Sequence, residues 1–188
     1  MTNYTLGNKY DLIQKKVLSS SSKDPVVIAK LAMHEPYVSL HGPEHHFLDG
    51  AAFLVAYHNA GGKIDIEKAL CSLAERTVMM PGAMCGYWGV CGSVASVGAA
   101  LSIINDTGPL SSDEHYKENM EFTSSVLKKM SVIGGPRCCK RNAFLSLQMA
   151  VAFVKEKWGI EMECDHIICE FSSLNLQCIG PRCPFHSK

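Results

Sequence analysis

Apolar residues recur at helical spacing along most of the chain. Residues 66–74 and residues 144–154 each carry an apolar stripe that repeats every three to four positions, with polar residues between. This period is typical of amphipathic α-helices. Taken with N-capping residues and with breaks at glycine or proline, it predicts helices over residues 10–18, 25–31, 43–59, 65–80, 92–105, 113–130 and 139–158.

Two segments depart from this amphipathic pattern. Residues 89–104 are almost all small or apolar, which predicts a buried helix whose Gly92, Ser96 and Ala100 allow another helix to approach closely. Beyond Gly159 the helical period disappears, and one or two short strands are expected within residues 162–169. We therefore predict a mainly α fold, a single-domain multi-helical bundle with an irregular, cysteine-rich C-terminal tail.

The same pattern divides the chain into three parts. Residues 1–23 are expected to form a peripheral segment, residues 24–160 a helical core, and residues 161–188 a tail packed on that core. A chain of 188 residues, 47% of them hydrophobic, is long enough to bury one core. We expect one structural domain overall.

The net charge of the chain and the length of its apolar segments indicate which partners and which cell compartment to expect. The formal net charge is zero, so nothing supports nucleic acid as a partner. Residues 1–11 lack a basic patch followed by an apolar run, and residues 89–104 are too few to span a bilayer and contain three serines. The sequence therefore predicts a cytoplasmic protein that does not associate with membranes.

The sequence contains nine cysteines, which indicate metal binding or thiol chemistry, because a reducing cytoplasm disfavours disulfides. Cys71 lies between apolar residues of a helix and is expected in the core, whereas Cys164 fits either role. The others lie in turn-forming or polar sequence, and three or four of them are expected to converge on a metal. These candidate ligands are Cys85, Cys91, Cys138, Cys139, Cys169, Cys178 and Cys183.

Local sequence around these cysteines adds detail. Cys91, Cys138 and Cys139 lie near predicted helix starts, where the helix dipole is expected to favour the thiolate. The tail spacing, C-x4-C-x8-C-x4-C, matches neither a zinc knuckle nor a ferredoxin motif, so a centre would collect ligands from separate loops. The predicted cofactor is an iron-sulfur cluster, [4Fe-4S] in type, with zinc as the alternative.

Four further residues near the cysteines are candidate cofactor-binding or substrate-binding residues. Arg137, Lys140 and Arg141 flank the Cys138-Cys139 pair, and their charge would attract a small anionic substrate. Trp88 lies between Cys85 and Cys91, where it would either shield a centre from water or pack in the core.

The motif HGPEHH at a predicted helix start is the second chemical signal. At this place the helix dipole favours neutral imidazoles, which can bind a metal or accept a proton. The alternative is a polar helix cap with no chemistry. The candidate catalytic residues are His41, Glu44, His45 and His46.

Four blocks, HGPEHH, CGYWGVCG, GGPRCCKR and CIGPRCPF, carry a resemblance to a known group. With them the chain resembles a small uncharacterised cysteine-rich family of anaerobic bacteria and archaea, whose members are sometimes described as S-adenosylmethionine-dependent methyltransferases or fused to them. The chain has no glycine-rich strand-turn-helix of its own for that cofactor. A looser similarity, to helical C-GCAxxG-C-C proteins, implies redox activity.

Three functions remain open from the residues. The first is an iron-sulfur protein with sulfur-transfer, lyase or redox chemistry assisted by HGPEHH. The second is a zinc-stabilised module that docks a partner protein, and the third is a thiol redox protein using Cys138 and Cys139. The sequence leaves the enzymatic status and the oligomeric state open.

Overall fold

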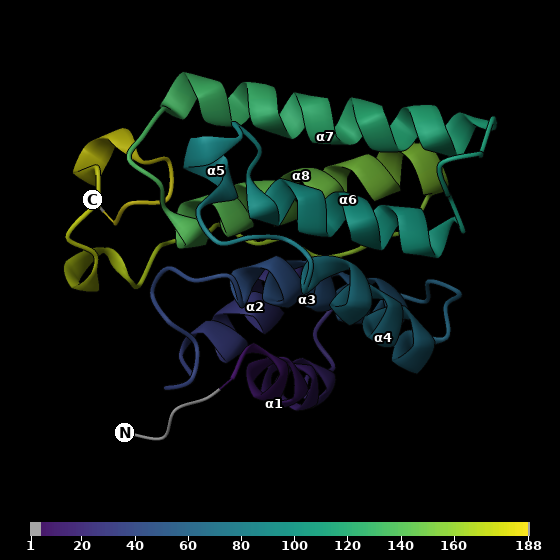
Figure 1. Ribbon diagram of the computed structural model, residues 1–188, viewed down its shortest axis with the longest axis horizontal. Coiled ribbons are helices and arrows are strands. Elements are labelled where there is room, and N and C mark those ends of the chain that lie inside the picture. Colours follow the sequence, from purple (N-terminus) through teal and green to yellow (C-terminus); the bar gives the residue numbers. More distant parts are fainter. Residues whose placement is uncertain (1–4, 188) are drawn as a thin grey trace.

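The computed structural model describes residues 5–187, and in this range the chain is helical, with an irregular C-terminal tail (Figure 1). The elements are α1 (Leu6–Leu18), α2 (Pro25–Met33), α3 (His45–Asn59), α4 (Ile66–Thr77), α5 (Met84–Tyr87), α6 (Gly92–Ile104), α7 (Glu114–Ile133), α8 (Cys139–Trp158), and the 3-10 turns η1 (Ser172–Leu174) and η2 (Gly180–Arg182). This confirms the predicted helical bundle.

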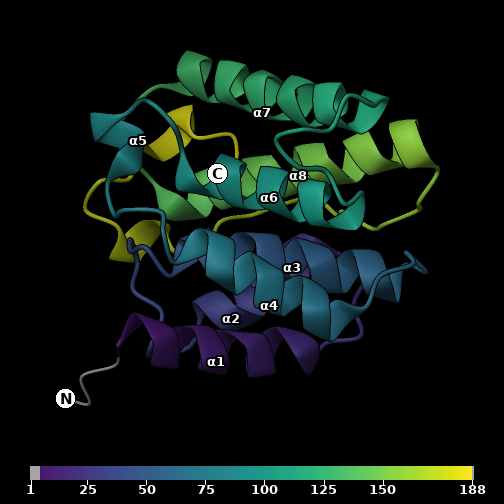
Figure 2. The same cartoon turned by 45° about the vertical axis from the view of Figure 1, so that its right-hand side comes forward.

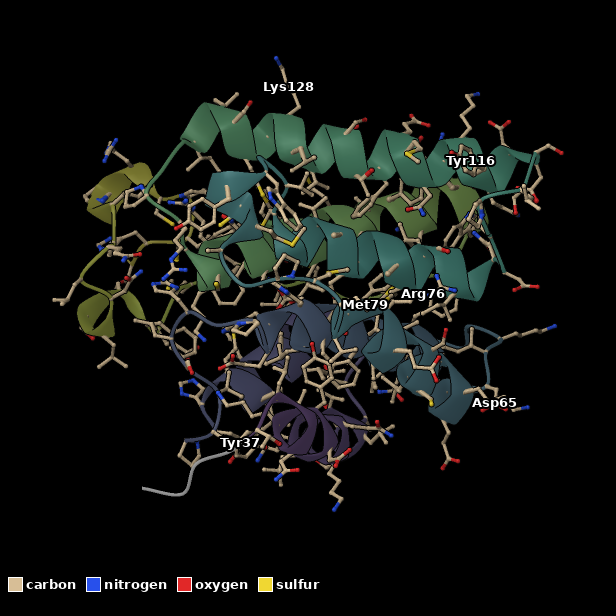
Figure 3. The ribbon with its side chains drawn as sticks, in the orientation of Figure 1. Tyr37, Asp65, Arg76, Met79, Tyr116 and Lys128 are labelled. Atoms are coloured by element: carbon tan, nitrogen blue, oxygen red, sulfur yellow. The ribbon has the colours of Figure 1, made fainter. Side chains whose placement is uncertain are left out.

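The long helices stack in layers (Figure 2). Helix α7 lies on one outside face, α6 and α8 lie beneath it, α3 and α4 form the next layer, and α1 and α2 close the opposite face. Several starts follow the predicted caps. Asp24 accepts hydrogen bonds from the Val26 and Val27 amides, and Pro25 begins α2. Asp65, labelled in Figure 3, caps α4 by accepting from the Lys68 amide.

Helix α3 is the centre of the core, because 13 of its 15 residues are buried. A helix that is apolar on all sides needs neighbours on all sides. Its closest neighbour is α6, where the Gly50 amide donates to the Ser96 hydroxyl at 2.9 Å. The predicted small-residue stripe on α6 therefore does allow a close approach. None of the described helices is both long enough and apolar enough to cross a membrane.

Helix α1 occupies the outer layer but contributes to the core. Ile13 and Val17 are fully buried, and the Tyr10 ring stacks on Phe47 of α3 at a centroid distance of 4.6 Å. Residues 1–4 of the predicted N-terminal segment, and residue 188 of the predicted tail, lie outside the described residues.

The C-terminal tail runs back from the end of α8 to the start of the same helix (Figure 1). Along the way the Glu163 amide donates to the Lys23 carbonyl, and Lys30 of α2 forms an ion pair with Glu170 at 2.6 Å. The strand expected within residues 162–169 is wrong. The tail has only an isolated parallel bridge between Cys169 and His186, because its other amides bond to the loop before α2 and to local turns.

Candidate metal centre

One end of the bundle brings together the HGPEHH loop, α5, the starts of α6 and α8, and the tail. Two adjoining cavities lie there, and Cys138 lines both. The smaller is named here the four-cysteine cavity after its thiols, which are Cys138, Cys169, Cys178 and Cys183. The larger is named the Asp49 cavity, and its potential ligands are His46, Asp49, Cys85, Cys91 and Cys139.

The four-cysteine cavity joins residues far apart in sequence. Cys138 is the N-cap of α8, while the other three cysteines lie in the tail before, between and after η1 and η2. Its volume is about 20 Å³. The tail returns to the start of α8, so this assembly follows directly from the fold (Figure 1). It comprises four of the seven cysteines predicted as ligands.

Each of the four sulfurs accepts a hydrogen bond from a nearby backbone amide. The Arg141 amide donates to Cys138 Sγ at 3.4 Å, and the Gly180 amide donates to Cys178 Sγ at 3.4 Å. Cys169 and Cys183 receive theirs from the amides of the residues two positions further on, Phe171 and Phe185. Amide donors of this kind stabilise negative charge on sulfur, and they tune metal-thiolate centres.

The wall between these sulfurs is apolar and carries two buried cations. Phe171, Ile179 and Phe185 supply the apolar surface. Lys140 is only 1% exposed, and its ammonium lies 3.3 Å from the Ser39 carbonyl, 3.0 Å from His45 Nε2 and over the Phe171 ring. None of these three partners carries a negative charge, and burial lowers the pKa of Lys140 to about 8.

Arg141, the second cation, is held by the backbone. Its guanidinium donates to the carbonyls of Gly134 and Pro136 at 3.0 and 2.9 Å. Lys140 and Arg141 are therefore buried in the wall, whereas a substrate-attracting role requires accessible charge. Arg137 alone of the three is exposed, and it lines the Asp49 cavity.

The thiols of the four-cysteine cavity influence one another. Burial raises the pKa of Cys169 and of Cys183, and repulsion from the neighbouring thiols raises both further. Four such groups can ionise together only if a cation joins them. Among residues 5–187, no three histidine, cysteine or acidic side chains are already arranged around a single metal ion.

The Asp49 cavity has a volume of about 240 Å³. Asp49 is 0% exposed, and neither of its carboxylate oxygens has a hydrogen-bond partner within the described residues. His45 Nδ1 lies 3.7 Å away from it. Asp49 is not among the residues predicted from the sequence. The signal was a lone carboxylate in the apolar run FLDGAAFLV, three residues after His46 and four after His45, which places all three on one side of a helix.

His46 is fixed by backbone contacts on one edge of its ring. It bonds to the Met80 carbonyl, and a Cβ atom at Gly92 would collide with its Nε2 and Cδ2 atoms. Its Nδ1 atom is buried and has no partner. The bond to Met80 is therefore made by Nε2–H, which leaves a lone pair on Nδ1. Burial lowers the pKa of His46, which favours the neutral imidazole.

His41 lies between the two cavities. Its Nδ1 accepts from the Cys139 amide at 3.4 Å, and its Nε2 donates to the Asn175 side chain at 3.1 Å. Burial is again the main cause that lowers its pKa. Asn175 in turn donates to Cys138 Sγ at 3.6 Å. His41 thus orients one residue of each cavity.

Glu44 does not line either cavity. Its carboxylate accepts hydrogen bonds from Lys9 of α1 at 2.9 Å and from the Ser39 amide at 2.7 Å. Burial, the largest single influence, raises its pKa, but these bonds together outweigh burial and lower the pKa to about 2. Through these bonds the carboxylate connects α1 and the loop before α3 to the start of α3. The predicted role of Glu44 in proton transfer stays a prediction.

Several expectations about individual residues are wrong. Helix starts were expected to favour thiolates, yet burial raises the pKa of Cys91 and raises that of Cys139 to about 12. Trp88 is 65% exposed, so it neither shields a centre nor packs in the core. Cys71 is exposed because Leu70 and Leu73 take the buried side of α4. Cys164 is half-buried.

Comparison with known proteins identifies the family of this chain. A model described as a family of unknown function (DUF5714) matches residues 13–186. The chain belongs to this family. The matched region includes both cavities, so every candidate ligand is part of the DUF5714 domain. No curated protein and no solved structure matches the chain. The association with methyltransferases and the anaerobic source stay predictions.

Proposed function

We propose that this DUF5714 protein is a metalloprotein in which Cys138, Cys169, Cys178 and Cys183 hold a [4Fe-4S] cluster. The observation that carries the proposal is that four thiols from two distant parts of the chain line one small cavity, and each accepts a backbone amide hydrogen bond. Four cysteine thiolates are the usual ligand set of such a cluster.

The charge balance around the cavity supports an anionic occupant. Four thiolates together with a [4Fe-4S] core carry net negative charge, and the buried side chains of Lys140 and Arg141 line the same cavity. A buried ammonium without an anionic partner is costly, and an anionic cluster nearby offsets that cost. The two cations act here as counter-charges to the centre.

Ligation by four cysteines selects among the chemistries left open by the sequence. A cluster with a cysteine on each iron supplies one-electron transfer when bound, whereas lyase or sulfur-transfer chemistry needs an iron without a protein ligand. The residues of this chain set the environment for that transfer. Phe171, Ile179 and Phe185 exclude water, and the four amide donors stabilise added negative charge on the sulfurs.

Anaerobic reconstitution with ferrous iron and sulfide tests the proposal. We expect about four iron and four sulfide per chain, with visible absorbance that is bleached by dithionite. Cys178→Ser should lose most of the iron and sulfide, whereas Cys71→Ser, which alters an exposed thiol on α4, should retain both. One zinc per colourless chain, or equal iron loading in the two variants, would contradict the proposal.

A further inference from the structure

The Asp49 cavity contains buried polar atoms that the protein itself leaves unsatisfied. Asp49 offers two carboxylate oxygens without partners, and His46 offers an Nδ1 atom without a partner. Buried polar groups in folded proteins are almost always hydrogen-bonded, and an unpaired buried carboxylate is especially costly. Two such groups lining one cavity indicate that something else binds them.

Asp49 and His46 can both act as electron-pair donors, although His45 Nδ1 also lines the cavity and lies 3.7 Å from Asp49. The Asp49 carboxylate has no proton to donate when ionised, and the Nδ1 atom of His46 carries a lone pair because Nε2–H bonds to the Met80 carbonyl. The thiols of Cys91 and Cys139 line the same cavity and lie close enough to Asp49 to be influenced by its charge. A carboxylate, an imidazole lone pair and two thiols around one cavity favour a cation.

The types of ligand atom in the cavity limit which metal ions it can bind. Imidazole and thiolate suit zinc and iron, whereas magnesium and calcium prefer sites built from oxygen ligands. The supporting contacts are also those of a metal site. The Met80 carbonyl fixes the tautomer of His46. The side-chain amide of Asn142 donates to Cys91 Sγ at 3.2 Å, and the backbone amide of Gly42 donates to the Cys139 sulfur.

We propose that the Asp49 cavity is a second metal site, which takes one divalent transition-metal ion on His46, Asp49, Cys91 and Cys139. It is separate from the four-cysteine cavity and does not depend on the cluster proposed there. In the described structure these donors lie around the wall and do not yet meet at one point. Binding therefore requires the two thiols to turn inward, and about 240 Å³ leaves room for that rotation.

The two adjacent cysteines at the start of α8 take different roles in this arrangement. Cys139 lines only the Asp49 cavity, whereas Cys138 also lines the four-cysteine cavity. Cys138 is the extended N-cap, and its sulfur accepts a hydrogen bond from the Arg141 amide. Cys139 is the first helical residue, and its sulfur accepts from the Gly42 amide, so the two thiols lie in different surroundings. The Cys138-Cys139 pair is thus divided between two metals in place of forming one redox pair.

Cobalt(II) is a suitable probe because thiolate ligation gives it charge-transfer absorption. We use the full chain carrying Cys169→Ser and Cys183→Ser, which removes two sulfurs of the four-cysteine cavity and leaves the Asp49 cavity intact. One equivalent of cobalt should bind with thiolate charge-transfer bands. Adding Asp49→Asn, which keeps the side-chain shape, should weaken binding at least tenfold, and adding Cys139→Ser should reduce the charge-transfer intensity.

Control variants distinguish cobalt binding at the Asp49 cavity from binding at the four-cysteine cavity and from misfolding. Adding Cys71→Ser to the same chain should leave the cobalt spectrum unchanged, and far-UV circular dichroism should be the same for all variants. If the altered chain does not fold, the titration is repeated on the metal-free wild type and its Asp49→Asn variant, which should bind one equivalent of cobalt less tightly. Cobalt binding that is indifferent to both Asp49→Asn and Cys139→Ser overturns the second site. Iron and sulfide content of the wild type tests the cluster independently.

Discussion

Replacing Glu44 with glutamine tests the structural role of the HGPEHH glutamate. The carboxylate is 1% exposed and is held by Lys9 and Ser39. Its pKa falls from 4.5 to about 2 in the folded protein, and each pKa unit corresponds to about 1.36 kcal/mol. The ionised carboxylate therefore contributes about 3 kcal/mol to the free energy of unfolding at pH 7.

The pH dependence of this contribution has a definite sign. Because folding depresses the pKa, the stabilisation is complete above the unfolded value of 4.5 and is lost as the pH falls toward 2. Urea unfolding of the metal-free protein, followed by circular dichroism, should show Glu44→Gln less stable by about 3 kcal/mol at pH 7 and by less than half of that at pH 3.

The matched control for this experiment is Glu75→Gln, which alters an exposed carboxylate on α4. It should change the free energy of unfolding by less than about 0.5 kcal/mol. A deficit for Glu44→Gln below 1 kcal/mol at pH 7, or a deficit that is the same at both pH values, would refute the argument.

Two other predictions concern packing and thiol access. Gly50→Ala should destabilise the protein by about 1–3 kcal/mol in urea unfolding, because the added Cβ would lie 2.7 Å from the Ser96 hydroxyl and 2.9 Å from the Ser96 carbonyl oxygen. The control is Gly7→Ala on α1, where an added Cβ would meet no atom within 4 Å. In metal-free protein at pH 8, iodoacetamide should modify exposed Cys71 first and Cys139 much later, since burial raises the pKa of Cys139 to about 12. Peptide mass spectrometry gives the order, and early labelling of Cys139 would count against its burial.

The helical part of the fold could be predicted because its signals are local. The apolar stripe of α8 and the aspartate caps of α2 and α4 depend on residues only a few positions apart. The tail lacks such signals. Its path is set by contacts with the loop before α2 and with α2 itself, such as the Lys30–Glu170 ion pair, so a strand was predicted where none forms among the described residues.

The candidate site could be predicted only in part. Seven cysteines were selected from their neighbours, but their division into two cavities depends on the tail returning to α8, which is a long-range contact. Cys71 was misplaced because its neighbour Leu70 was given more weight than the apolar stripe of α4. Trp88 was misplaced because local sequence does not show which side of the turn after α5 faces solvent. Asp49 was overlooked because a single carboxylate gives no periodic signal.

The location of iron in the molecule tests the central claim most directly. Crystals of protein reconstituted without oxygen should give an anomalous difference map, at the iron absorption edge, with its strongest peak between Cys138, Cys169, Cys178 and Cys183. A map with no iron peak among these four sulfurs, from protein that contains stoichiometric iron, would contradict the account.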